Sequence, residues 1–218
     1  GWPLSERSIL FLQGVIMALA STTKLNAINT ILSAVGEAPV NSLTGSLTAD
    51  VRLAESILDE TSREVQSVGW HFNTEKDVPL TPNSEDEVNI GTNIVRVDLE
   101  DSNINSNYDI VIRGTRLYNR KKLTYTFTAT LKYTVVYLLE FSDLPENARR
   151  YVMIRAARIY QDRLIGSEKH SMFTRADEQQ ALFSLRDYEM ESADYSIFDN
   201  IDVARIIDRT SVINRVNS

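Results

Sequence analysis

Two segments near the N-terminus place apolar residues at alternating intervals of three and four, the pattern of a helix with one apolar face. The first begins after Thr22 or Thr23, either of which suits an N-cap, and ends before Gly36 and Pro39, which stop helices. The second spans roughly residues 48–68. The expected inward positions are Leu25, Ile28, Ile31 or Leu32 and Val35, then Val51, Ala54, Leu58, Thr61, Val65 and Val68. We expect two helices that pack antiparallel across a short loop.

Residues 76–141 change to short runs of β-prone residues, separated by Asn, Asp, Ser and Gly. The segment Arg113-Gly114-Thr115-Arg116 is typical of a hairpin turn between two such runs. The expected strands lie near residues 88–90, 94–99, 108–112, 117–118 and within 124–139. The pattern predicts an antiparallel β region of five to seven strands.

Helical signals return with Asp143-Leu144-Pro145-Glu146, which combines an N-cap, an early proline and a glutamate three residues after the cap. This helix is expected to run to about Ile165 and to stop at Gly166. Apolar residues on two of its sides predict a central position in the bundle. A last helix is expected at about 172–195, with an apolar face formed by Met172, Ala176, Phe183 and Met190.

These segments together predict an α+β protein: an antiparallel helical bundle with an inserted antiparallel β region and an extended C-terminal arm. The expected bundle comprises residues 21–75 and 142–200, and the inserted β region residues 76–141. Residues 1–20 are expected to form an N-terminal extension. Residues 201–218 are expected to be a docking arm whose apolar residues include Ile206 and Ile207.

The N-terminal extension allows three interpretations. Residues 9–20 are mostly apolar and end in small residues, which is typical of a short signal peptide. Met17 is also a possible internal start of translation. We favour an apolar arm that packs on a neighbouring subunit, because the preceding residues carry only one cation and Gln13-Gly14 interrupts the apolar run.

Composition argues against several classes of function. The net charge of −7 and the pI near 5.0 argue against a general nucleic-acid binder. The chain has no cysteine and only two histidines, His71 and His170, so we expect neither a thiolate nor a histidine-rich metal centre. The sequence contains no phosphate-loop, dinucleotide, zinc-protease or esterase motif. We therefore expect no cofactor, no metal and no catalytic residue.

The acidic runs Glu85-Asp86-Glu87 and Glu100-Asp101 superficially match a carboxylate pair of a glycosidase or a calcium site. Carboxylates adjacent in sequence are more typical of a solvated face, and we favour that interpretation. His71, between Trp70 and Phe72, is a possible base. We expect instead an aromatic cluster that closes the core, with Trp70 and Phe72 as wedges that fix how the chain leaves the helix. Gly36 and Pro39 are likewise expected to fix how the chain leaves the first helix.

Five arginines are spread around the third expected helix, whereas the last helix is mostly acidic. Nucleic acid would favour a single basic face, so this distribution indicates ion pairs within the bundle or between subunits. The arginines are Arg149, Arg150, Arg155, Arg158 and Arg163. We predict a subunit or partner interface that includes Arg149, Arg155, Arg158 and Glu189, together with Ile206 and Ile207 of the arm.

Four segments, in this order, resemble the tail tubular protein A family, the head-to-tail adaptors of short-tailed phages of the T7 type. They are LNAINTILSAVGEAPV at 25–40, the 65–73 segment that ends in GWHFN, RGTRLYNR at 113–120, and the helix that starts at Leu144-Pro145-Glu146 and contains Arg155-Ala156-Ala157. Each segment is short, and the ordered set is what makes the resemblance specific. It covers roughly residues 21–200.

The resemblance implies a structural part of the virion tail that is assembled in the host cytoplasm and is not an enzyme. Such adaptors form a ring, expected to be a dodecamer, between the portal protein and the nozzle protein, tail tubular protein B, with tail fibres docking near that joint. DNA is expected to pass through the lumen without specific binding, and no membrane is implied. Two alternatives stay open: a virion-associated hydrolase of cell wall or polysaccharide, and an exported interaction domain.

Overall fold

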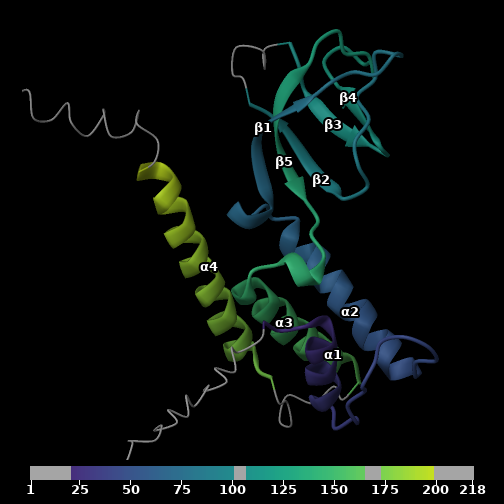
Figure 1. Ribbon diagram of the computed structural model, residues 1–218, viewed down its shortest axis with the longest axis vertical. Helices are drawn as coiled ribbons and strands as arrows, with labels where there is room; N and C mark the ends of the chain where they lie inside the picture. The colour runs from purple at the N-terminus through teal and green to yellow at the C-terminus, as the bar shows by residue number, and fades with distance from the viewer. Residues whose placement is uncertain (1–20, 101–106, 165–172, 199–218) are drawn as a thin grey trace, which may run out of the picture.

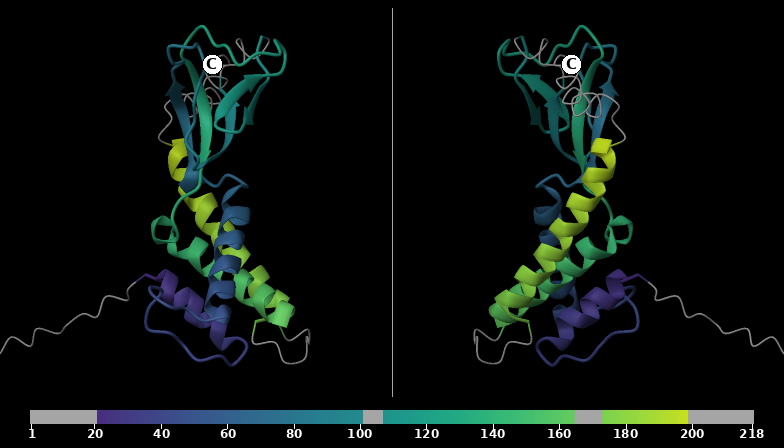
Figure 2. Two further views of the ribbon diagram at one scale, coloured as in Figure 1. Left: turned by 90° about the vertical axis from the view of Figure 1, so that its right-hand side faces the viewer. Right: turned by 90° about the vertical axis from the view of Figure 1, so that its left-hand side faces the viewer.

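The computed structural model describes residues 21–100, 107–164 and 173–198. Four helices pack together, and two small antiparallel sheets lie at one end of them (Figure 1). Two opposite side views, each turned by 90° from the view of Figure 1, show the same division between the helical part and the β region (Figure 2). The predicted α+β class is confirmed, with the β region inserted between the second and third helices. The expected C-terminal arm lies outside the described residues.

The elements follow one another in the order helix, helix, five strands, helix, helix. The helices are α1 (Lys24–Ser33), α2 (Ala49–Gln66), α3 (Glu146–Leu164) and α4 (Arg175–Phe198). The strands are β1 (Thr74–Leu80), β2 (Ile94–Leu99), β3 (Ile110–Arg113), β4 (Arg116–Asn119) and β5 (Leu131–Tyr137). Two 3-10 turns, η1 (His71–Asn73) and η2 (Phe141–Asp143), lie where the chain enters and leaves the β region.

The ends of α1 follow from local sequence. The Thr23 side chain caps the helix by accepting a hydrogen bond from the Asn26 N–H at 3.1 Å. Gly36 adopts φ +82°, and the Glu37 N–H donates to the Leu32 carbonyl at 3.1 Å. This is the Schellman ending, in which a glycine without Cβ takes the left-handed position. The predicted stop at Gly36 is therefore confirmed.

The third helix is central, as its sequence predicts. α3 contacts α1, α2 and α4 (Figure 1). Its buried apolar side chains lie on several sides of the helix, and three of them are alanines that let neighbouring backbones approach closely. They are Ala148, Tyr151, Val152, Ile154, Ala156, Ala157 and Tyr160. This helix thus organises the helical core.

The face predicted for the last helix is wrong. Phe183 and Met190 are 56% and 60% exposed, whereas Ala181 and Leu185 are the buried residues of α4. Positions 183 and 185 are separated by about 200° around a helix, so they point in opposite directions. The small Ala181 allows α4 to approach α3 closely, and this packing selects the face with less apolar surface. Phe183 and Met190 remain on an outer surface.

The β region contains a three-stranded sheet in the order β1-β5-β2 and the separate hairpin β3-β4. The predicted turn is confirmed: Arg113 pairs with Arg116, and Gly114 takes φ +63° in the two-residue loop. The strand expected within 124–139 is shorter, because only Leu131–Tyr137 forms β5. The expected strand at 88–90 is replaced by isolated bridges, although Val88 and Ile90 are buried.

Tyr133 lies on β5 in the core of the β region, and its hydroxyl has no hydrogen-bond partner among the described residues. Burial raises the pKa of Tyr133 to about 12, and the nearby Tyr108 adds to the shift. The folded protein therefore keeps a proton that the unfolded chain releases near its ordinary pKa of 10. The stability of the folded state that depends on a protonated Tyr133 is fully present below pH 10 and is lost as the pH rises toward 12.

We expect Tyr133→Phe to leave the free energy of unfolding unchanged or to raise it by up to about 1 kcal/mol at neutral pH, because the buried hydroxyl is unsatisfied. The advantage of the variant should grow above pH 10. Urea unfolding at neutral and alkaline pH measures both effects. A clear loss of stability at neutral pH would show that the hydroxyl has a partner.

Candidate functional site

Two short segments join the helical part to the β region: residues 67–73 after α2, and residues 138–140 after β5 (Figure 1). Two polar side chains, Gln66 and Asn73, are each only 2% exposed at this joint. Buried polar groups are costly unless their hydrogen bonds are made. The contacts of these two residues therefore determine how firmly the two parts are connected.

Gln66 forms hydrogen bonds with the segment that leaves β5. Its Nε2 donates to the Ser62 Oγ at 3.0 Å and to the Leu139 carbonyl at 3.1 Å. Its Oε1 accepts from the Leu139 N–H at 2.7 Å. The side chain thus pairs with both backbone groups of one residue, as a neighbouring strand would.

Asn73 completes the connection. Its Nδ2 donates to the Gln66 carbonyl at 2.9 Å and to the Tyr137 carbonyl at 2.7 Å. Its Oδ1 accepts from the Trp70 N–H at 2.8 Å. Both amide hydrogens and the oxygen are used, so the end of α2 and the end of β5 are held together at a fixed distance. Satisfied side-chain amides of this kind favour a stiff joint.

Trp70 and Phe72 lie half-buried against the helical core, and their rings stack with centroids 6.5 Å apart. The Trp70 indole N–H donates to the Val65 carbonyl at 2.7 Å, which satisfies one of the last carbonyls of α2. The expectation for His71 is wrong: it is exposed rather than part of the aromatic cluster. Its backbone N–H donates to the carboxylate of Glu189 on α4.

Gly36 and Pro39 are exposed in the turn after α1. Asn29 holds this turn, because its side chain donates to the Val40 carbonyl at 2.9 Å and accepts from the Val40 N–H at 2.8 Å. The predicted wedge role of Gly36, Pro39, Trp70 and Phe72 stays a prediction that mutation can test.

We expect Trp70→Ala to lower the free energy of unfolding by about 2 kcal/mol, less than for a fully buried tryptophan because the ring is half-exposed. The loss combines apolar contact with Phe72 and the hydrogen bond to Val65. Chemical denaturation followed by circular dichroism measures it. Trp70→Phe, which keeps an aromatic ring but not the donor, should lose less. Equal losses in the two variants would show that the ring itself contributes nothing.

A cluster of ion pairs connects three helices. Glu178 of α4 pairs with Arg155 Nη1 at 2.7 Å and with Arg158 Nε, both from α3. Arg155 Nη2 also reaches Glu64 of α2 at 2.6 Å. Burial alone would lower the pKa of Arg155, but Tyr151 and the two carboxylates outweigh it, so the pKa is raised. The guanidinium stays charged and bridges α2, α3 and α4.

The other predicted interface residues also have partners within the chain. Arg149 donates to the carbonyls of Leu144 at 2.7 Å and Thr22 at 3.0 Å. Glu189 is half-buried and receives the His71 N–H. Ile206 and Ile207 lie outside the described residues. A further role of Arg149, Arg155, Arg158 and Glu189 between subunits stays a prediction.

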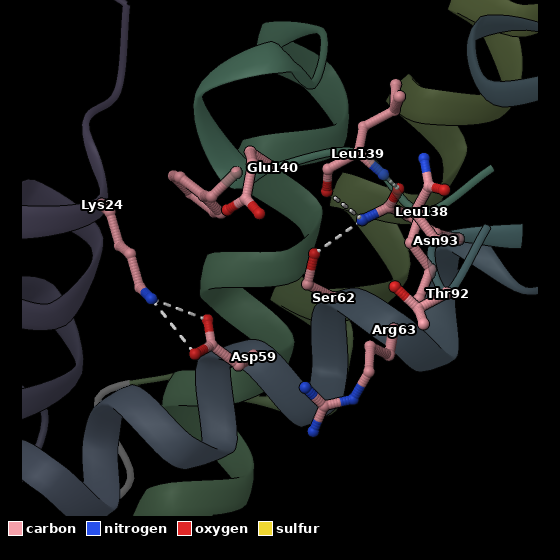
Figure 3. Close-up of a pocket in the computed structure, with 11 residues that line it drawn as sticks. Lys24, Asp59, Ser62, Arg63, Thr92, Asn93, Leu138, Leu139 and Glu140 are labelled. Atoms are coloured by element: carbon pink, nitrogen blue, oxygen red, sulfur yellow. Dashed lines mark hydrogen bonds and ion pairs between the residues drawn. The ribbon is translucent and has the colours of Figure 1, made fainter.

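A cavity of about 310 Å³ lies beside the joint (Figure 3). Figure 3 shows Lys24 of α1 reaching Asp59 of α2 across it, and the Lys24 ammonium lies 3.0 Å from both Asp59 and Glu55. Burial opposes the charge of Lys24, but these two carboxylates raise its pKa. Arg63 and Glu140 also line the cavity. The lining contains no histidine or cysteine, and the Lys24 ammonium stays protonated between its two carboxylates, which makes it a poor nucleophile.

The acidic runs have ordinary surface environments where the structure describes them. Glu87 pairs with Arg116 through both carboxylate oxygens, at 2.8 and 2.9 Å, while Glu85 and Asp86 are exposed. The Glu100 carboxylate accepts a hydrogen bond from the Thr134 hydroxyl. Among the described residues, no group of three or more acidic or histidine side chains is arranged to hold a metal ion. Nor is any described helix long and apolar enough to cross a membrane.

Sequence reasoning missed Gln66, Asn73 and Glu178 as organising residues. The burial of Gln66 was not visible in the pattern, because it lies about 100° around α2 from Val65, outside the expected apolar stripe. The link from Asn73 to Tyr137 had no signal, because the two residues are distant in sequence, whereas the pairing of Glu178 follows the expected ion pairs between the basic third helix and the acidic last helix.

Comparison with known proteins identifies the family of this chain. The family described as Tail tubular protein matches residues 25–195. Tail tubular protein A of Klebsiella phage KP34 is 29% identical over 167 residues, which cover 76% of this chain and 86% of that protein. Because the family match spans more than half of the sequence, this chain belongs to the tail tubular protein family, whose members are structural components of phage tails.

Proposed function

We propose that this protein is a ring-forming adaptor in the virion tail, which joins the portal protein to the nozzle protein and extends the DNA channel. Family membership supports a structural tail role. The observation that carries the adaptor role is the joint at Gln66 and Asn73, which ties the helical part to the β region. A coupling part must transmit position between two partners, and a satisfied buried network provides that stiffness.

The ring, which we propose to be a dodecamer, needs two different complementary faces on each subunit, because its contacts are head-to-tail around an axis. The outer surface of α4 supports one such face, since Phe183 and Met190 are exposed there at a spacing of seven residues. Covering these side chains with a neighbour would remove apolar surface from water. The acidic net charge suits a lumen that passes DNA without holding its phosphates.

The test is to mix the purified chain with the portal protein and to image the product by electron microscopy. We expect one ring of this chain on the portal, and the nozzle protein to bind only after that ring has formed. Tail fibres would be added last. A chain that binds neither portal nor nozzle, or that turns over a polysaccharide, would contradict the adaptor proposal.

We expect a chain that lacks residues 201–218 to fold as before but to assemble poorly, since this segment is apolar without a core of its own. Thermal unfolding of the monomer should change little, whereas ring formation on the portal should fall severalfold. Light scattering measures assembly. Rings that form at the same protein concentration with and without the segment would dismiss it as a docking arm.

A further inference from the structure

The β3-β4 hairpin and the turn after it, residues 110–123, carry a concentrated positive charge. This segment, the basic hairpin, contains five cations and no carboxylate, in a chain whose net charge is −7. The cations are Arg113, Arg116, Arg120, Lys121 and Lys122. The basic hairpin lies at the end of the β region away from the helices (Figure 1). The segment is therefore the most basic part of an acidic molecule, although Arg116 and Arg120 pair with the neighbouring carboxylates Glu87 and Asp109.

Three of these cations lie over tyrosine rings. Arg113 lies 3.7 Å from the ring centroid of Tyr118. Arg116 lies 4.5 Å from that of Tyr125, and the Lys122 ammonium 5.1 Å from that of Tyr108. Such contacts hold long side chains in place, which reduces the entropy they lose when a partner binds. Tyr118 is only 8% exposed and Tyr108 also stacks on Phe127, so these rings are poorly placed to stack with nucleic-acid bases.

Leu123 ends the basic hairpin and is 76% exposed. Its φ of +53° is left-handed, a conformation that glycine adopts without the steric cost of a Cβ. Within the described chain, little of this side chain is buried, so its packing does not offset the cost of the left-handed backbone conformation. A large apolar side chain held outward beside cations is suited to insertion into another protein.

We propose that the basic hairpin docks on an acidic protein surface that contains an apolar recess for Leu123. The inference rests on the adaptor function, which makes the portal and the nozzle the candidate carriers of that surface. Exposed leucine and covered rings favour a protein over DNA, whose phosphates would not bury an apolar side chain. Glu87 and Asp109 pair with Arg116 and Arg120 within the chain, so the docking charge comes mainly from Arg113 and Lys122 beside Leu123, and binding to a second copy is an outcome that the test must separate.

The experiment compares the full chain with Leu123→Gly and Lys122→Glu for binding to immobilised portal and, separately, to immobilised nozzle protein. We expect both variants to weaken binding to the same partner, either the portal or the nozzle protein, by about tenfold each. Leu123→Gly should melt no lower than the parent, because glycine suits the left-handed backbone. Lys76→Glu, at an exposed cation on β1, is the matched control and should bind like the parent. Raising the salt should weaken the parent more than Lys122→Glu.

Two further assays compare the parent with Leu123→Gly and Lys122→Glu. One measures binding to a DNA duplex, and the other measures self-assembly of the chain without portal or nozzle protein. Unchanged binding of Leu123→Gly and Lys122→Glu to both proteins would overturn the inference and leave the adaptor function standing. So would a loss confined to duplex binding or to self-assembly, since the surface would then serve DNA or a second copy. If the parent binds neither portal nor nozzle, the adaptor proposal fails, and the inference fails with it.

Discussion

Asn73→Ala is expected to lower the free energy of unfolding by about 3–5 kcal/mol, a large effect for the loss of one polar side chain. The change removes three hydrogen bonds and leaves the Gln66 and Tyr137 carbonyls and the Trp70 N–H without that partner. An unsatisfied buried group costs more than the bond itself contributed. Urea unfolding followed by circular dichroism measures the loss.

The same variant should also separate the two parts of the molecule. With Trp2 replaced by phenylalanine, so that Trp70 is the remaining tryptophan, we expect the fluorescence at the joint and the circular dichroism of the helices to change together in the parent. In Asn73→Ala the fluorescence should change at a lower urea concentration, because Trp70 loses a partner of its backbone. Asn89→Ala, at an exposed asparagine of the β region, is the control and should behave like the parent. If the fluorescence and the circular dichroism of Asn73→Ala still changed together, and its free energy of unfolding matched that of the parent, this side chain would not hold the joint.

Glu178→Gln is expected to lower the free energy of unfolding by about 3 kcal/mol at neutral pH. The change leaves Arg155 and Arg158 of α3 without their shared carboxylate on α4. The side chains of the three residues are at most 24% exposed, so water replaces the lost charge only poorly. The loss should persist at high salt, because ions screen partly buried pairs less than exposed ones.

Glu191→Gln provides the matched control on the same helix. Glu191 is exposed, and its removal should change stability by less than about 0.5 kcal/mol. The comparison is made by thermal and urea unfolding at low and high salt. If the two glutamine variants proved equally stable, the ion-pair cluster would contribute nothing to stability, and α4 would be held by its apolar packing and by the hydrogen bond from His71 to Glu189.

Local sequence predicted the starts and stops of elements well. Thr23 and Gly36 enclose α1, and Gly114 forms the hairpin turn, because a cap or a positive φ depends on residues close in the chain. The prediction failed for α4, whose spacing of Phe183 and Met190 indicated an inward face. Which face of a helix is buried depends on the shape of its neighbours, and here the small Ala181 fits against α3.

The site was predictable only in part. Trp70 and Phe72 stand out by residue type, and both lie at the joint. The arginines of α3 also stood out, and the alternative of ion pairs within the bundle describes Arg155 and Arg158, whose partners lie on neighbouring helices. The connection of Gln66 and Asn73 to Leu139 and Tyr137 was not predictable, because it joins residues more than sixty positions apart.

The sequence by itself determined the α+β class, the order of helices and strands, and most of their ends, because hydrophobic period, caps and turns are encoded within a few residues. Only the tertiary structure decided which side of α4 faces solvent, where the helical part is bound to the β region, and which charges neutralise one another. Those outcomes depend on packing and on hydrogen bonds between distant segments, and a linear pattern of residues does not contain the distances that select them.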